Sequence, residues 1–217
     1  MRFPRRRSPR SPDHRVVHQV ASWCLSYPDD ELLGRLPILR AALADDPASR
    51  LLQPLLDHLD TTGADELRRE YIDLFDLSRR HTLYLTYWTD GDTRRRGASL
   101  GAFKQAYRDS GFLVNLRGGE LPDHLPIVLE FCACADPERG IQLLQQYRPA
   151  LELLRRSLVK VDSDYASALE AVCSTIPPGD APSDPAAALG SQIPVETVGL
   201  EPYDPRLLPL SATSNGG

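Results

Sequence analysis

Residues 120–131 place two acids, an imidazole and two prolines directly before a run of apolar side chains. Asp123 is a natural N-cap, because its carboxylate can accept hydrogen bonds from the free amides of a first helical turn. Pro126 then falls at the third helical position, where its missing N–H costs nothing, so we expect a helix that starts sharply at Asp123. His124 stands at the mouth of this helix, where it can grip a carboxylate or carbonyl of a partner. Such a rigid mouth favours binding over catalytic turnover.

The residues after this start have the spacing of one buried helix face. Leu125, Val128, Leu129 and Cys132 follow the i, i+3, i+4, i+7 rule, whereas Glu130 points away from that face. Two interpretations stay open here. The segment is either a well-capped core helix or the mouth of a partner-binding surface.

The histidines and cysteines do not have the spacing of a metal site. His14 and His18 share a helix face at i, i+4, but they make no site by themselves. Cys132 and Cys134 diverge by about 200° around a helix, so they cannot both bind one ion. The four cysteines also lack the density of a disulfide framework, which favours reduced thiols in a cytosol. We expect no metal and no bound cofactor.

Signatures of catalysis are also missing from the sequence. It has no Gly-x-Ser-x-Gly elbow around a nucleophile and no phosphate-binding loop of the Walker type. The carboxylate pairs at residues 29–30 and 45–46 stand at expected helix starts, where the helix dipole favours acids. The sequence therefore indicates a protein that is not an enzyme.

Two arginine clusters flank an aromatic segment at residues 84–88. Arginine beside aromatic rings can hold phosphate or carboxylate groups through forked hydrogen bonds and stacking. A solvated, charged rim explains the same pattern, and both interpretations stay open. The candidate anion or cofactor-phosphate rim consists of Arg79, Arg80, Arg94, Arg95 and Arg96.

Helical periodicity runs almost unbroken from residue 13 to about residue 176. Residues 83–88 favour a strand by type, but no second candidate strand exists to pair with them. We therefore predict an all-α, single-domain helical bundle of about eight or nine helices. The expected helix starts lie near residues 13, 29 or 30, 46, 64, 92 or 93, 123, 136, and 162 or 163.

The sequence divides into three parts. Residues 1–12 form a basic arm, residues 13–176 form the helical domain, and residues 177–217 form a Pro- and Gly-rich tail; we expect the arm and the tail to be disordered. The arm carries paired arginines, but no apolar stretch follows them as in an export signal. A net charge of −5 disfavours nucleic acid as a partner, and no segment approaches the roughly 20 apolar residues of a membrane span.

Four stretches in order resemble a known family. They are residues 71–76, 79–87, 91–97 and 120–126, the last followed by Leu129, Glu130 and Phe131. Together they resemble the nitrate reductase assembly chaperones of the NarJ group. This group lies within the wider TorD/DmsD-like family of maturation chaperones for molybdenum enzymes. The resemblance covers residues 16–176 and excludes the arm and the tail.

The resemblance implies a cytoplasmic, all-helical chaperone without a cofactor of its own. It would bind the N-terminal peptide of the catalytic subunit of nitrate reductase and hold that subunit open for molybdenum cofactor insertion and membrane assembly. Proteins of molybdenum cofactor biosynthesis are further implied partners. The expected peptide-binding surface consists of Tyr71, Leu74, Phe75, Trp88, Asp123, His124, Leu125, Pro126 and Glu130.

Two other functions remain open at this point. One is a helical adaptor chaperone that serves a different molybdoenzyme. The other is a protein of the same fold that binds a nucleotide or a cofactor phosphate through the arginine clusters. Of the three, the sequence favours the nitrate reductase chaperone.

Overall fold

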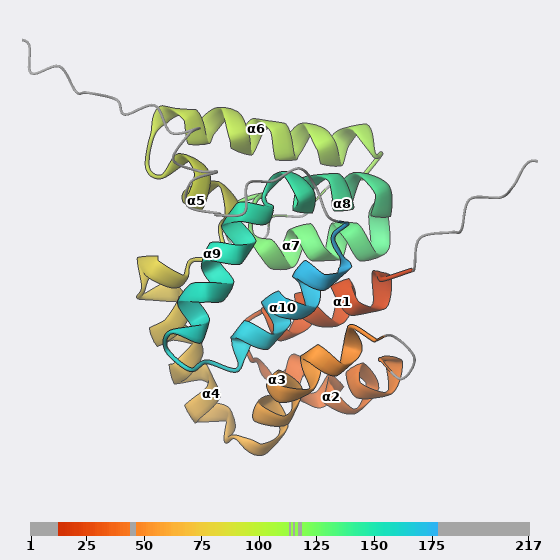
Figure 1. The fold of residues 1–217 in the computed structure, drawn as a ribbon, viewed down its shortest axis with the longest axis vertical. Coiled ribbons are helices and arrows are strands. Elements are labelled where there is room, and N and C mark those ends of the chain that lie inside the picture. Colours follow the sequence, from red (N-terminus) through yellow and green to blue (C-terminus); the bar gives the residue numbers. More distant parts are fainter. Residues whose placement is uncertain (1–12, 44–46, 113, 115, 117–118, 178–217) are drawn as a thin grey trace, which may run out of the picture.

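The computed structural model describes residues 13–43, 47–112, 114, 116 and 119–177 (Figure 1). The basic arm, almost all of the tail, the helix start expected at Asp46 and part of the loop at residues 115–119 lie outside the described residues. Within the described ranges the chain forms ten α-helices and no strand. The all-α class is confirmed, and the helix count exceeds the eight or nine expected. None of these helices is long and apolar enough to cross a membrane.

Short helices joined by tight turns make up the fold. The α-helices are α1 Arg15–Cys24, α2 Asp30–Ala42, α3 Ser49–Thr61, α4 Ala64–Tyr71, α5 Leu85–Asp90, α6 Arg94–Asp109, α7 Leu125–Glu130, α8 Pro137–Gln146, α9 Arg148–Val159 and α10 Tyr165–Thr175. A π-helical turn prolongs α4 (Ile72–Asp76) and another prolongs α7 (Phe131–Ala135), while a 3-10 turn covers Arg79–His81. The two π-helical turns have no signal in the sequence pattern.

Local capping signals set several helix ends as predicted. Asp29 accepts a hydrogen bond from the Leu32 amide at 2.8 Å, and Asp136 accepts one from the Arg139 amide at 3.0 Å. Gly111 follows α6 with φ of 75°, the left-handed conformation that ends many helices. These positions depend only on near neighbours in the chain, so the sequence is sufficient to predict them.

The sequence predicts one long helix from residue 136, but the structure divides it into α8 and α9. The break falls at Tyr147, whose φ of −98° and ψ of 14° are not helical. Pro149 explains the division, because it has no N–H to donate to the Gln145 carbonyl and its ring would clash there. Pro149 instead occupies the first turn of α9, where no such donor is needed.

Two helices from opposite ends of the described chain, α1 and α10, lie side by side in the middle of the molecule (Figure 1). The buried His18 ring on α1 hydrogen-bonds to the Thr175 hydroxyl on α10 at 2.8 Å. On another side α1 packs along α7, where the Ser22 hydroxyl donates to the Pro126 carbonyl at 2.8 Å. Helix α1 therefore connects the N-terminal helices to the segment singled out in the sequence.

The aromatic segment at residues 83–88 forms no strand in the described structure, as predicted. It makes one antiparallel bridge, between Tyr84 and His124, and then becomes α5. The Leu85 amide donates to the Asp123 carbonyl at 3.1 Å, and the Leu125 amide donates to the Leu83 carbonyl at 2.9 Å. These bonds join the starts of α5 and α7.

Candidate functional site

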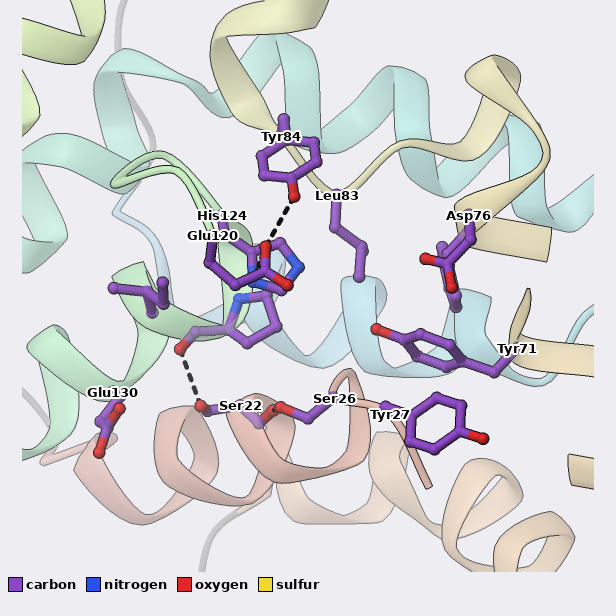
Figure 2. Close-up of a pocket in the computed structure, with 13 residues that line it drawn as sticks. Ser22, Ser26, Tyr27, Tyr71, Asp76, Leu83, Tyr84, Glu120, His124 and Glu130 are labelled. Carbon is purple, nitrogen blue, oxygen red and sulfur yellow. Dashed lines mark hydrogen bonds and ion pairs between the residues drawn. The ribbon is translucent and has the colours of Figure 1, made fainter. Parts of the chain in front are cut away.

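A pocket of about 440 Å³ opens between α1, the π-helical turn after α4, the residue 83–84 segment and α7 (Figure 2). Four segments distant in sequence contribute its walls. From α1 and the turn after it come Ser22, Ser26 and Tyr27, and from the end of α4 and its π-helical turn come Tyr71, Phe75 and Asp76. The remaining wall consists of Leu83, Tyr84, Glu120, His124, Pro126, Ile127 and Glu130.

The structure gathers part of the predicted peptide-binding surface in this pocket. Five of its nine residues line the pocket, namely Tyr71, Phe75, His124, Pro126 and Glu130. The other four face elsewhere. Leu125 is fully buried in the core, Leu74 packs half-buried against the core, Trp88 donates its indole N–H to the Thr82 carbonyl at 3.0 Å, and Asp123 is fully buried.

The Asp123 carboxylate caps the start of a different helix from the one predicted, although Tyr84 occupies the N-cap position of that helix. Its Oδ2 atom accepts hydrogen bonds from the Thr86 amide at 2.9 Å and the Thr86 hydroxyl at 2.6 Å, in the first turn of α5. The N-cap of α7 is His124, without a side-chain cap, and Pro126 is the second helical residue rather than the third. The backbone bonds between the starts of α5 and α7 turn Asp123 toward α5, which local sequence cannot reveal.

The helical face predicted after Asp123 is confirmed. Leu125, Val128, Leu129 and Cys132 are all fully buried, whereas Glu130 is exposed at the pocket edge. This face anchors α7 in the core. The polar residues at its start and at Glu130 therefore have a fixed position.

A polar group of three side chains forms one wall of the pocket. The Tyr84 hydroxyl donates to Glu120 Oε2 at 2.6 Å, and His124 Nδ1 lies 3.7 Å from the same oxygen. Burial lowers the pKa of His124 below its ordinary value, although the Glu120 carboxylate opposes this shift. Burial, and then the hydrogen bond to Glu120, raise the pKa of Tyr84. At neutral pH the wall therefore carries the negative charge of Glu120 beside a neutral imidazole.

The opposite wall of the pocket is aromatic. The Tyr71 ring meets Tyr27 edge-on, with ring centres 5.6 Å apart, and Phe75 at 4.9 Å. The Tyr71 hydroxyl donates to the Leu25 carbonyl at 3.0 Å, and burial raises its pKa. This wall offers ring faces and edges to an apolar side chain.

The π-helical turn after α4 sets the position of this aromatic wall. Its hydrogen bond from the Leu77 amide to the Ile72 carbonyl, at 2.9 Å, spans five residues instead of the four of an α-helix. The extra residue in the turn changes the direction of the side chains that follow, and Phe75 and Asp76 line the pocket from within it. Insertions of this kind are frequent at functional sites.

The pocket is acidic. Asp76, Glu120 and Glu130 line it, and no lysine or arginine of the described chain does so. Asp76 and Glu130 are exposed, and neither has an ion-pair partner among the described residues. The pocket thus combines aromatic surface with two carboxylates that have no basic partner among the described residues.

The arginines of the predicted anion rim lie outside the pocket. Arg79 and Arg96 both approach Asp92, at 3.5 and 3.6 Å, and Arg95 lies 4.0 Å from Asp90. The Arg96 guanidinium also lies 5.8 Å from the ring centres of both Tyr84 and Tyr87, and its Nε donates to the Thr86 hydroxyl at 3.2 Å. Arg80 and Arg94 are exposed. The structure therefore brings the two clusters together, but around acids of the chain itself.

Sequence reasoning missed eight residues of the pocket. Asp76, Tyr84 and Glu120 lie inside the stretches that carry the family resemblance, so those stretches contained the signal. Ser22 comes from α1, and Ser26 and Tyr27 come from the turn after it, where the sequence pattern shows only a buried stripe. The other two are Leu83 and Ile127.

The sequence matches proteins of nitrate reductase assembly. The family model described as nitrate reductase delta subunit matches residues 42–171. NarJ of Bacillus subtilis (strain 168), named a probable nitrate reductase molybdenum cofactor assembly chaperone, is 32% identical over 76% of this chain and 90% of its own length. NarJ of Escherichia coli (strain K12), a nitrate reductase molybdenum cofactor assembly chaperone, is 30% identical over 68% of this chain and 64% of its own.

Two further matches extend this comparison. The nitrate reductase-like protein NarX of Mycobacterium tuberculosis (strain ATCC 25618 / H37Rv) is 44% identical over 74% of this chain, which spans about a quarter (24%) of NarX. The crystal structure of a candidate redox enzyme maturation protein from Archaeoglobus fulgidus superposes with a TM-score of 0.58 over 78% of this chain and 98% of its own, at 22% identity, which supports the fold alone. The resemblance to the NarJ group is confirmed, and the chain belongs to the nitrate reductase delta subunit family.

Proposed function

We propose that this chain is a maturation chaperone for a nitrate reductase. It acts in the cytoplasm, binds the N-terminal peptide of the apo catalytic subunit in the pocket between α1 and α7, and keeps that subunit open for molybdenum cofactor insertion and membrane assembly. Family membership and the names of the two NarJ relatives support the maturation role. Proteins that deliver the cofactor would be further, transient partners.

The observation that carries the peptide proposal is the pairing of an aromatic wall with unneutralised acids. An amphipathic helix presents apolar anchors on one face and charged side chains beside them. The ring faces of Tyr27, Tyr71 and Phe75 suit an apolar anchor, and Asp76 and Glu130 suit lysine or arginine next to it. A pocket of about 440 Å³ receives a few side chains rather than a whole helix. The peptide would therefore lie across the mouth and insert its anchors.

The geometry also suits binding rather than reaction. The Tyr84 hydroxyl on the polar wall is already hydrogen-bonded to Glu120. The Ser22 hydroxyl is committed to the Pro126 carbonyl and the Ser26 hydroxyl to the Ser22 carbonyl at 2.8 Å, so neither serine is paired with a base. These commitments support a stoichiometric binding role.

The proposal is tested by titrating a synthetic N-terminal peptide of the client subunit into the chain in a calorimeter. Glu130→Gln removes one exposed carboxylate from the pocket edge while keeping its size, so we expect roughly fivefold to tenfold weaker binding at low salt. Glu170→Gln is the matched control, because Glu170 is exposed on α10 outside the pocket lining. Equal affinity for the wild type and both variants would remove this pocket from the proposal.

The observations favour this function over the two alternatives. A nucleotide or cofactor phosphate would meet acids in the pocket, and Arg79, Arg95 and Arg96 already face acids of the chain. A client other than nitrate reductase would use the same pocket chemistry. Peptides from another molybdoenzyme therefore belong in the same titration, and a preference for one of them would reassign the client without changing the mechanism.

A further inference from the structure

We propose that the basic arm at residues 1–12 is an internal ligand of the acidic pocket and competes there with the client peptide. The inference rests on the proposed function in one respect, since it uses the same pocket. It adds a form of regulation: the chaperone occupies its own site until a stronger ligand displaces the arm.

Charge complementarity selects the arm as the occupant. The arm has no acidic residue and five arginines, which are Arg2, Arg5, Arg6, Arg7 and Arg10. The pocket presents Asp76, Glu120 and Glu130 and no basic side chain of the described chain. The other terminal segment, residues 178–217, carries five acids and one arginine. That segment would be repelled by the pocket, whereas the arm would be attracted.

The connection to α1 gives the arm access to the pocket. Helix α1 begins at Arg15 and contributes Ser22 to the pocket, which is about 10 Å farther along at 1.5 Å per residue. Twelve residues of extended chain span about 40 Å. About a third of the arm therefore suffices to return along α1, and the remainder can enter the pocket.

The position of Glu130 favours this route. Figure 2 shows Glu130 beside the Ser22 end of α1, while Asp76 lies toward Tyr27 at the other end. One turn beyond Glu130, the Cys134 thiol contacts the Gln19 side chain at 2.8 Å, which places this part of the α7 segment against the first half of α1. An arm that folds back along α1 meets Glu130 first and Asp76 farther along, toward Tyr27.

The side chains of the arm match both walls. Arg5, Arg6 and Arg7 can form forked hydrogen bonds to exposed carboxylates, and Phe3 can pack on the aromatic wall. A tethered ligand also has an effective concentration of about 1 mM. If the free arm peptide binds with a Kd of about 100 µM, the tether would keep the pocket about 90% occupied and weaken client binding about tenfold.

The test uses the full chain with Arg5, Arg6 and Arg7 replaced by Gln. The matched control replaces three exposed arginines outside the pocket, Arg50, Arg108 and Arg156, by Gln, so that the change in net charge is the same. We expect the client peptide to bind the arm variant about tenfold more tightly than the wild type and the control variant within about twofold of it. The gain should shrink at high salt, because screening weakens the arm contact.

A second titration keeps this inference separate from the proposed function. A synthetic peptide of residues 1–12 should bind the arm variant and bind about fivefold more weakly when Glu130→Gln is added. Because Glu130→Gln weakens the competing arm as well as the client, its full effect on client affinity is measured in the arm variant. Binding of the arm peptide without binding of the client peptide would overturn the proposed function and leave the arm as a ligand. Equal client affinity of the wild type and the arm variant would overturn the inference and leave the proposed function. A gain that disappears on dilution of the protein would assign the arm to a second copy and also overturn the inference.

Discussion

The pocket and the arginine-rich region around α5 and α6 lie next to each other but differ in how their charges are balanced. In the arginine-rich region, Arg79 and Arg96 share Asp92, and Arg96 reaches the Thr86 hydroxyl that Asp123 holds. In the pocket, Asp76 and Glu130 have no basic partner among the described residues. We infer that the first region fixes the start of α5 and that the second has charge available for a partner.

This contrast matters because the sequence points to basic residues as the binding groups, whereas the pocket is acidic. Clustered arginines beside aromatic residues suggest an anion site, yet three of the five face acids of the same chain. The acids of the pocket are spread over residues 76–130 and do not form a cluster of charge in the sequence. The availability of a charge for a ligand depends on its neighbours in space rather than on its density in sequence.

The largest expected effect is on stability, at the buried end of the arginine-rich region. Asp123→Ala should lower the free energy of unfolding by about 3 kcal/mol, because it removes a cap and leaves the Thr86 amide and hydroxyl without their acceptor. Asp29→Ala, which removes an exposed cap from α2, is the control and should cost about 1 kcal/mol. Urea denaturation measures both.

Asp123→Ala could also cost less stability than this. Asp123 Oδ1 is buried with no hydrogen-bond partner in the described structure, so desolvation offsets part of what the carboxylate contributes. A loss for Asp123→Ala no larger than that for Asp29→Ala would show that the two terms cancel. The hydrogen bonds between Asp123 and Thr86 would then add no more stability than an exposed cap does.

The second largest effect should appear in binding, at the pocket. The double variant Asp76→Asn with Glu130→Gln should weaken client peptide binding by about 2 kcal/mol at low salt, since both unneutralised carboxylates are lost. Its free energy of unfolding should stay within about 0.5 kcal/mol of the wild type, because neither side chain holds the fold together. Calorimetry at low and high salt checks the first expectation and urea denaturation the second. A clear loss of stability would mean that these acids belong to the scaffold.

A smaller effect concerns pH at His124. Burial lowers its folded-state pKa, so the unfolded chain binds the proton more readily. The contribution of His124 to stability is complete above its unfolded pKa of about 6.5 and is lost as the pH falls from that value through the lower folded pKa. Protonation of the folded protein adds positive charge beside Glu120, so a basic peptide should bind more weakly below the folded pKa of His124 than at pH 7.5. Asp76, Glu120 and Asp123 oppose the pKa shift.

His124→Gln provides the comparison for this prediction. The variant should show a flatter dependence on pH between 7.5 and 5.5, both in unfolding free energy and in peptide affinity. Identical pH profiles for the variant and the wild type would show that His124 does not titrate in this range. The pocket wall would then carry the same charge throughout.

The smallest effect is expected at the outer edge of the arginine-rich region. Arg79→Gln should change the free energy of unfolding by no more than about 0.5 kcal/mol, because its side chain is 83% exposed and its ion pair with Asp92 is screened by water. Client affinity should also stay within about twofold. Substantially weaker binding of the client peptide to this variant would add Arg79 to the partner-binding surface and reduce the contrast between the two regions.

Some features of the site could be predicted from the sequence because they depend on close neighbours. The buried face of α7 follows from the spacing of Leu125, Val128 and Leu129, and all three are fully buried. The family resemblance pointed to several residues that do line the pocket, such as Tyr71 and Glu130. Whether these residues bind a peptide remains a prediction.

Other features could not be predicted, because their partners lie far away in the chain. Asp123 has the residue type and position of a local N-cap. Its carboxylate instead accepts hydrogen bonds from Thr86, which lies 37 residues earlier. Tyr27 enters the pocket only because α1 packs against α7. The π-helical turn that places Phe75 and Asp76 has no residue pattern of its own.

The sequence by itself determined the helical class, several helix ends and the apolar face of α7, because these follow from periodicity and capping over about one or two helical turns. Only the tertiary structure decided which acids have a basic partner and which do not. A carboxylate is neutralised by whichever charge approaches within about 4 Å. In this fold Arg79, Arg95 and Arg96 meet acids that lie close to them in the chain. Asp76 and Glu130 are brought to one pocket from distant segments and meet no basic partner among the described residues.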